Sequence, residues 1–327
     1  SFLKDAIEVD VDAICDTRDV FIAGIMEHIE QAGVHSGDSA CSIPPYTLSK
    51  QTIEKIKTQT RKIALGLKVK GLINIQFAIK GEDIYILEVN PRASRTVPFV
   101  AKATGVSVAK LATLVMVGEK LRKIIEIETV EQQINDIDHF AVKEVVFPFN
   151  KFSYSDIILG PEMKSTGEAM GLDSSFAIAY AKAQMGCFNY LPKKGNVFIS
   201  VKDSDKRSMI SISATLEDMG YKIYATKGTA KFLKNNGIEV NEINKVQEGS
   251  PHIVDLMNKK EISLVINTTE GDKSIQDSFS IRRTSIMMKI PYTTTASGAR
   301  EIVKALKELN SKETLEIKEI QSYNRCF

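Results

Sequence analysis

The sequence lacks the usual signs of a disulfide-rich, zinc-binding or membrane-embedded protein. Its cysteines, Cys15, Cys41, Cys187 and Cys326, are scattered and include no CxxC pair, which favours a reduced, cytoplasmic chain with incidental thiols. Its four histidines have neither HxxxH nor HExxH spacing, so we expect no zinc site. No apolar run approaches the roughly 20 residues that a bilayer span requires.

No single sign of charge dominates either. The 327 residues include 43 basic and 41 acidic side chains, a formal net charge of +2, which gives no sign of a nucleic-acid partner. With 43% hydrophobic and 26% charged residues, the composition is globular and leaves room for about two domains. The start, SFLKDAIEVD, has neither an initiator Met nor a signal-peptide pattern, so we expect the chain to be part of a longer one.

One stretch, NIQFAIKGEDIYILEVNPRASRTV, carries the clearest pattern. It holds two strand-like runs, Asn74–Lys80 and Ile84–Asn90, joined by the turn-forming residues Gly81-Glu82-Asp83. Alternate apolar side chains in the first run predict a strand with one apolar and one polar face. We therefore expect an antiparallel hairpin.

The polar face of this hairpin predicts a magnesium–nucleotide site. Gln76 and Glu88 are equally far from the turn, so they are expected to lie opposite each other, with Asn90 on the same face as Glu88. Hard oxygen ligands suit Mg²⁺, which shares its coordination with water and nucleotide phosphates. Arg92 and Arg95 follow at once, and guanidinium groups suit the phosphates. The alternative is a set of solvated side chains at the edge of a sheet.

The flanking segments predict further strands and helices of the same domain. Ala6–Ile14 alternates strictly and predicts a half-buried strand with Glu8 on an acidic, solvent-facing side. Glu30–Cys41, glycine-rich and polar, predicts a loop that either binds a ligand or only connects two elements. Helical spacing marks Lys50–Lys68, with Ser49 as its expected N-cap.

From about Pro192 strand and helix patterns alternate, which predicts a doubly wound parallel sheet. We place a first domain at 1–150, a connecting segment with a helix at 151–190 and the second domain at 191–327. Hydroxyl, amide and lysine side chains follow three of the predicted strands. Because the carboxyl ends of parallel strands share one edge, we expect a phosphate-binding site there, although each loop alone also fits helix capping.

Five segments together match the pattern of one family. Glu27–Leu48, Asn74–Gly105 and Lys143–Phe152 resemble the second synthetase half of the carbamoyl phosphate synthetase large subunit. Gly160–Gly171 and the motifs ATKGTA, INTTEG and IRRT within Ala225–Thr284 resemble its C-terminal region. The resemblance implies an α/β protein: the C-terminal lobe of an ATP-grasp domain, with a mixed or antiparallel sheet and helices, followed by a doubly wound methylglyoxal-synthase-like domain.

The resemblance also implies a reaction, the ATP-dependent phosphorylation of carbamate to carbamoyl phosphate in pyrimidine and arginine biosynthesis. The residues implied to be catalytic are Glu88, Arg92 and Arg95, and those implied to bind Mg²⁺ or Mn²⁺ are Gln76, Glu88 and Asn90. The residues implied to contact ATP are Leu3, Glu8, Gly33, Val34, His35, Ser36, Gln76 and Glu88. Those implied to border a K⁺ site are Glu8, His28, Gln31, Val34 and Ser36.

Allosteric control through the second domain is implied as well. The residues implied to bind the nucleotide effectors UMP and IMP are Ser200, Lys206, Thr226, Thr229, Lys245, Asn267 and Thr269. Those implied to contact the effector ornithine are Glu30, Asp38 and Glu144. The implied partners are the N-terminal part of the large subunit and a glutaminase small subunit, and the sequence leaves room for an oligomer. Because a preceding ATP-grasp lobe is absent, we expect this chain alone to be inactive but able to bind effectors.

We weigh three alternatives, of which methylglyoxal synthase is disfavoured. The chain could be a stand-alone effector-sensing module. It could be another ATP-grasp ligase of the biotin-carboxylase type, which shares the metal hairpin but leaves 191–327 unexplained. Methylglyoxal synthase itself needs a catalytic Asp in a phosphate pocket, and Lys227-Gly228-Thr229 with Asn267-Thr268-Thr269 supplies only the rim.

Overall fold

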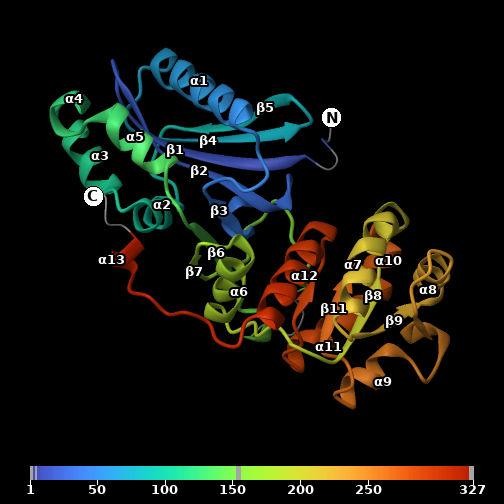
Figure 1. The fold of residues 1–327 in the computed structure, drawn as a ribbon. Helices are drawn as coiled ribbons and strands as arrows, with labels where there is room; N and C mark the ends of the chain where they lie inside the picture. Colours follow the sequence, from blue (N-terminus) through green and yellow to red (C-terminus); the bar gives the residue numbers. More distant parts are fainter. Residues whose placement is uncertain (1–2, 4–5, 152–155, 324–327) are drawn as a thin grey trace.

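Two β-sheets organise the chain, and Figure 1 shows them as two neighbouring lobes. The structure is a computed structural model that describes residues 3, 6–151 and 156–323. The first sheet has seven strands and the second has five. Cys326 and residues 152–155 of the predicted connection lie outside the described residues.

The first sheet is antiparallel at every strand pair, in the order β5-β4-β1-β2-β3-β6-β7. Its strands are β1 Ile7–Asp16, β2 Val20–Gln31, β3 Cys41–Ile43, β4 Lys70–Lys80, β5 Asp83–Asn90, β6 Phe140–Val146 and β7 Gly167–Asp173. The predicted antiparallel sheet is therefore confirmed. The segment 151–190 contains its expected helix, and it also contributes β7 to this sheet. This strand was not predicted, because its short, glycine-containing sequence shows no clear alternation.

Helices cover both faces of the first sheet. On one face, α1 (Lys50–Gly66) packs Ile56 and Ala64 against apolar side chains of β1, β2 and β4. Ser49 caps this helix as predicted, because its hydroxyl accepts a hydrogen bond from Thr52 N at 3.1 Å. The helices that share the core on the other face are α2 Val97–Thr104, α3 Val108–Met116, α4 Leu121–Ile124 and α5 Ile127–Asn135.

The predicted hairpin forms between β4 and β5 and places Gln76 opposite Glu88. Its turn is shorter than predicted, because Asp83 already belongs to β5 and pairs with Lys80. A two-residue turn alone would bring Leu87 opposite Gln76. The register shifts between Gln76 and Phe77, so that Leu87 has no partner and Glu88 takes its place.

The second sheet is parallel throughout, in the order β10-β9-β8-β11-β12. Its strands are β8 Asn196–Ser200, β9 Lys222–Thr226, β10 Asn241–Ile243, β11 Leu264–Asn267 and β12 Tyr292–Thr293. Its helices include α7 Lys206–Asp218, α8 Lys227–Lys234, α9 Ile253–Asn258, α10 Asp272–Asp277, α11 Phe279–Met287 and α12 Ala296–Ser311. α7, α8 and α12 share the core of one face, and α9 and α11 that of the other, so the predicted doubly wound sheet is confirmed.

A continuous apolar core joins the two lobes. α6 (Phe176–Gly186) and α12 belong to one buried cluster that includes Val142 of β6 and Ile199 of β8. In Figure 1 these two helices lie between the sheets. Because one core crosses the predicted boundaries, the division into 1–150, 151–190 and 191–327 stays a prediction.

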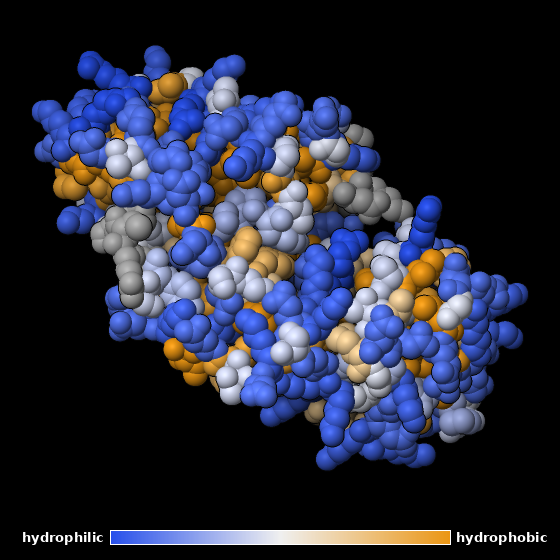
Figure 2. All heavy atoms as spheres, viewed as in Figure 1, coloured by the Kyte–Doolittle hydropathy of each residue, from blue (hydrophilic) through white to orange (hydrophobic). Residues whose placement is uncertain are grey.

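The visible surface is mostly hydrophilic, and apolar atoms gather in separate patches in the view of Figure 2. Within the described residues, no single helix has the length and apolar character needed to cross a membrane. Together α2 and α3 meet the length and composition test, but they are bent by 118° at their junction.

The tightest backbone approach in the first sheet gives a prediction about stability. A Cβ on Gly171 of β7 would stand 2.0 Å from the carbonyl oxygen of Ala179 and 2.5 Å from the amide nitrogen of Ala183, both on α6. We expect Gly171→Ala to lower the free energy of unfolding by about 3 kcal/mol, because backbone atoms must move. Urea unfolding followed by circular dichroism measures this.

Gly160→Ala is the matched control, since a Cβ there meets nothing within 4 Å. It should unfold within about 0.5 kcal/mol of the wild type. Equal stability of the two variants would contradict the packing of β7 on α6.

Candidate functional site

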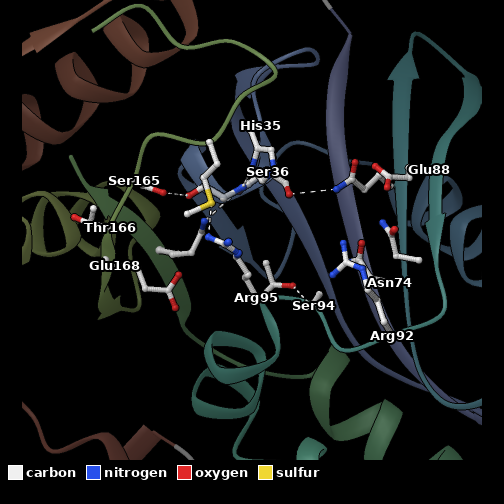
Figure 3. A pocket seen from close by; sticks show the side chains of 17 residues that line it. His35, Ser36, Asn74, Glu88, Arg92, Ser94, Arg95, Ser165, Thr166 and Glu168 are labelled. Atoms are coloured by element: carbon white, nitrogen blue, oxygen red, sulfur yellow. Dashed lines mark hydrogen bonds between the residues drawn. The ribbon is translucent and has the colours of Figure 1, made fainter. Parts of the chain in front are cut away.

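A cavity of about 540 Å³ opens over the polar side of the first sheet. It is bordered by β4, β5, the loop after β5 and the loop that follows β2. The sequence-predicted residues that line it are His35, Ser36, Gln76, Glu88, Asn90, Arg92 and Arg95. Figure 3 shows Glu88 and Arg92 on one side of the cavity and Ser165, Thr166 and Glu168 on the other.

Three oxygen-bearing side chains meet on the β4–β5 side. Gln76 and Glu88 are a cross-strand pair, and Asn90 pairs with Asn74 on the same side. The Gln76 amide donates through Nε2 to Ser36 Oγ at 3.2 Å, which leaves its oxygen for a cation. One carboxylate with two amide oxygens fits Mg²⁺ that also binds nucleotide phosphates. Only one of the three side chains is acidic. Within the described residues, no group of three or more His, Cys, Asp or Glu side chains is arranged to hold a metal ion.

The two arginines lie in the loop after β5, with both side chains exposed. Arg92 Nη1 donates to the carbonyl of Ala93 at 3.1 Å, and Arg95 Nη1 contacts the sulfur of Met163. Met163 lines the opposite wall, so Arg95 reaches across the cavity. Other guanidinium nitrogens remain for an anionic ligand between the walls.

The buried carboxylate of Asp12 holds this loop in place. Asp12 accepts hydrogen bonds from Thr96 Oγ1 at 2.5 Å, Ser94 Oγ at 2.7 Å and Asn74 Nδ2 at 3.0 Å. Burial raises the pKa of Asp12 from 3.8 to about 6, against the opposing effect of these hydrogen bonds. The prediction that the acidic side of β1 faces solvent was wrong, because Glu8, Asp10 and Asp12 are only 1–4% exposed.

The far wall of the cavity was not predicted as part of the site. It comes from β6, from the segment before β7 and from the start of β7, and its polar members are Lys143, Ser165, Thr166 and Glu168. Lys143 is 1% exposed and donates through Nζ to the carbonyl of Ser36 at 3.3 Å. A lysine inside the apolar run VKEVVF was the available signal, since burying an unneeded charge is costly.

The remaining residues implied for ATP and K⁺, among them Leu3, Glu8, Gly33 and Val34, are not part of the cavity lining. Glu8 is buried 3.9 Å from His28 Nδ1, and the Gly33 backbone N–H donates to Glu8. Burial raises the pKa of Glu8, partly offset by His28.

Asp10, which the sequence gave no role, is the close partner of His28 at 3.1 Å from Nε2. Burial alone would lower the pKa of His28, but the hydrogen bond and charge of Asp10, with the charge of Glu8, raise it. A buried cluster of opposite charges therefore lies under the loop that carries His35 and Ser36.

Predicted effector residues gather at one edge of the second sheet. Ser200, Thr226 and Asn267 end the neighbouring strands β8, β9 and β11. Ser200 Oγ lies 3.1 Å from Thr226 Oγ1, and Asn267 Nδ2 donates to the carbonyl of Ser200 at 3.1 Å. The strand order reverses beside β8, which is where doubly wound sheets bind ligands.

The other predicted effector residues surround this edge less closely. Thr229 is buried, and its hydroxyl accepts a backbone N–H from the loop after β8 at 3.4 Å. The Lys206 ammonium lies over Gly228, 3.5 Å from where a Cβ would stand. Lys245 is exposed after β10, and Thr269 is half-buried after β11. Hydroxyls, an amide and an ammonium group, the last paired with Asp203 at 2.7 Å, thus lie at an edge of the kind that binds phosphate.

A second cavity, of about 680 Å³, lies between the lobes and contains two of the three residues implied for ornithine, Glu30 and Glu144. Tyr292 of the second sheet lines the same cavity. The pKa of Glu144 is raised to about 8. The larger cause is burial, and the smaller is the charge of Glu30. Asp38 does not line this cavity; its carboxylate instead accepts the backbone N–H of Ser165 at 2.8 Å.

Two family models match the chain. Residues 1–124 match "Carbamoyl-phosphate synthase L chain, ATP binding domain", and residues 208–294 match "MGS-like domain". The carbamoyl phosphate synthase large chain of Rhizobium meliloti (strain 1021) is 51% identical over 323 residues, which are 99% of this chain and 28% of that protein. This chain belongs to the carbamoyl phosphate synthase large-chain family.

A further relative is named as a C-terminal section of the large chain. This protein, from Aquifex aeolicus (strain VF5), is 50% identical over 320 residues, which are 94% of this chain and 59% of that protein. The chain therefore spans 28% and 59% of these two relatives. The biotin carboxylase subunit of pyruvate carboxylase overlaps 57% of this chain and 46% of its own, with 15% identity and a TM-score of 0.44, too low to support a conclusion.

Asp12 gives a prediction about pH and stability. Between pH 3.8 and about 6 the folded protein keeps a proton on Asp12 that the unfolded chain releases. Raising the pH through this window therefore lowers the stability of the wild type, by about 3 kcal/mol in total. Asp12→Asn removes this loss, so its unfolding free energy should fall less from pH 4 to 7, as urea unfolding at each pH will measure.

Asp83→Asn, at the exposed start of β5, is the matched control and should follow the wild-type pH curve. If the Asp12→Asn curve ran parallel to the wild type as well, the raised pKa of Asp12 would be refuted.

Proposed function

We propose that this chain supplies the site at which a carbamoyl phosphate synthase phosphorylates carbamate, within a longer, cytoplasmic large chain. The observation that carries the proposal is the cavity itself, which is lined by Gln76, Glu88 and Asn90 together with Arg92 and Arg95. The large-chain family accounts for both lobes in one sequence, which a biotin-carboxylase-type ligase or methylglyoxal synthase does not. A glutaminase small subunit and the rest of the large chain are the partners we propose.

In the proposed reaction, a carbamate oxygen attacks the γ-phosphorus of ATP. The new O–P bond forms as the bond to ADP breaks, which yields carbamoyl phosphate and ADP. Mg²⁺ or Mn²⁺, when bound by Gln76, Glu88 and Asn90, neutralises charge on the phosphate oxygens. Arg92, on the same side as Glu88, and Arg95, which reaches across the cavity, hold the transferred phosphoryl group.

Carbamate is an anion, and the far wall offers it a cation. Lys143 is buried and close to Ser36, so its ammonium group can attract carbamate without solvent screening. Asp12 keeps Ser94 and Thr96, and with them Arg95, at a fixed position. The protein thus acts mainly by positioning and by charge stabilisation. K⁺ in the Glu8–His28 cluster would balance the buried acidic charge there.

Two regulatory ligands are part of the proposal. A nucleoside monophosphate, UMP or IMP, binds with its phosphate at the edge formed by Ser200, Thr226 and Asn267. Ornithine binds in the cavity between the lobes, with an ammonium group at Glu30 and Glu144. Support for the second ligand is the pair of half-buried carboxyl groups that line this cavity, whose mutual repulsion a cation relieves.

The first test replaces the metal carboxylate. In the large chain that carries this segment, Glu88→Gln should slow ATP formation from carbamoyl phosphate and MgADP by about 10²-fold or more, because a charge that holds the metal is lost. Glu82→Gln, on the exposed turn of the same hairpin, is the control and should stay within twofold of the wild type.

Unchanged ATP formation in Glu88→Gln, with nucleotide-effector binding intact, would favour the alternative in which the chain only senses ligands.

The second test uses the raised pKa of Glu144. At pH 7 this carboxyl group is mostly protonated, and a cationic ligand favours its ionised form. Ornithine binding at pH 7 should therefore release about 0.9 proton per ligand. Calorimetry of the chain in two buffers of different ionisation enthalpy measures this release.

Glu144→Gln should bind ornithine without proton release and more weakly. Norvaline, which lacks the δ-amine, is the control ligand and should not bind. Equal enthalpies in the two buffers for the wild type would contradict the role of Glu144.

A further inference from the structure

A series of hydrogen bonds joins the effector edge of the second sheet to the wall of the phosphorylation cavity. It runs through the segment Asp156–Thr166, between β6 and β7. We propose that this segment couples the two sites, with the ion pair between Asp156 and Arg282 as the contact that the effector phosphate weakens. The inference rests on the proposed function, since it requires a nucleoside monophosphate at that edge.

At the effector end, Arg282 of α11 is 2% exposed and holds the Asp156 carboxylate with Nε and Nη2, a bidentate contact along one edge of the guanidinium group. The Nε–Oδ1 distance is 2.7 Å, and Nη2 donates both to the other carboxylate oxygen and to the carbonyl of Ile275, the latter at 2.8 Å. Nη1 lies 3.5 Å from Oδ1 of Asn267. One guanidinium therefore contacts both the segment and a residue predicted to bind the effector.

From Asp156 the hydrogen bonds continue along the segment. Lys164 Nζ donates to the carbonyl oxygens of Asp156 at 3.2 Å and Ile158 at 2.8 Å, which folds the segment back on itself. The backbone N–H groups of Lys164 and Ser165 donate to the two carboxylate oxygens of Asp38 at 2.7 and 2.8 Å. Asp38 is 1% exposed, so these bonds are shielded from water.

The last bonds reach the loop that carries His35 and Ser36. Ser165 Oγ donates to the carbonyl of Gly37 at 2.8 Å, and the His35 N–H donates to the carbonyl of Gly160 at 2.8 Å. His35, Ser36 and Ser165 all line the phosphorylation cavity. A shift of the segment therefore moves this wall.

Charge gives the coupling its direction. A phosphate group beside Asn267 brings a second anion close to the buried Arg282, and it competes with Asp156 for the same guanidinium. Loss of the Asp156 contact releases the segment, which in turn loosens the loop around Ser36. Binding at each site then changes the equilibrium of one shared element, and the coupling is reciprocal.

Hydrogen–deuterium exchange of the chain with and without UMP tests the proposal. At saturating UMP, peptides covering 33–39 and 156–166 should exchange at least about twofold faster in the wild type. In Asp156→Asn the same peptides should exchange fast without UMP and should not respond to it. Asp218→Asn, the same change at an exposed position of α7, should behave as the wild type.

Because the coupling is reciprocal, UMP affinity is a second measurement. Asp156→Asn would not change this affinity if Asp156 had only a structural role. When the pair is already absent, UMP no longer has to weaken it, so Asp156→Asn should bind UMP about threefold to tenfold more tightly in calorimetry. Arg282→Lys keeps the charge but loses the bidentate contact, and should show the same fast exchange if Asp156→Asn fails to fold.

The outcomes separate the two proposals. Binding of UMP to the wild type with unchanged exchange at 33–39 would overturn the coupling and leave the effector site standing. A response to UMP that persists in both variants would also overturn it. Absence of UMP binding to the wild type would refute the effector site and the coupling together.

Discussion

The burial of polar side chains on one side of the first sheet is the constraint on which the site depends. Asp12 has almost no contact with water, so its carboxylate must be satisfied by Asn74, Ser94 and Thr96. Those bonds in turn fix the loop that carries Arg95. The same burial leaves Lys143 and the acidic groups near His28 unscreened, where charge has its greatest effect.

The shared core gives this polar side a second support. α6 packs against β6 and β7 of the first sheet, and α12 packs against α6 and against strands of both sheets, so the lobes cannot separate without exposing buried apolar surface. Both cavities and the effector edge are therefore held in one framework. Within it, the segment Asp156–Thr166 is held largely by hydrogen bonds, which makes it the part best suited to change its contacts.

Much of the fold could be predicted from local pattern, and much of the site could not. The alternation of strands and helices predicted the second sheet, because each of its helices and strands has a regular pattern that depends only on residues close in the sequence. The Gln76–Glu88 pair was predicted from equal distances to the turn, but it forms through a shorter turn and an unpaired Leu87. β7 and α2 were missed, because neither segment has a strong period.

The remaining misses have long-range causes. Alternation in β1 shows that two faces differ but not what covers each face, so Asp10 and Asp12 were placed in solvent. Lys143 and Ser165 reach the cavity only through the pairing of β3, β6 and β7.

The most direct test of the account is the anomalous scattering of Mn²⁺ in crystals of the large chain grown with MnADP. The account predicts a Mn²⁺ peak within coordination distance of Gln76, Glu88 and Asn90; a nucleotide-bound Mn²⁺ away from all three would contradict it.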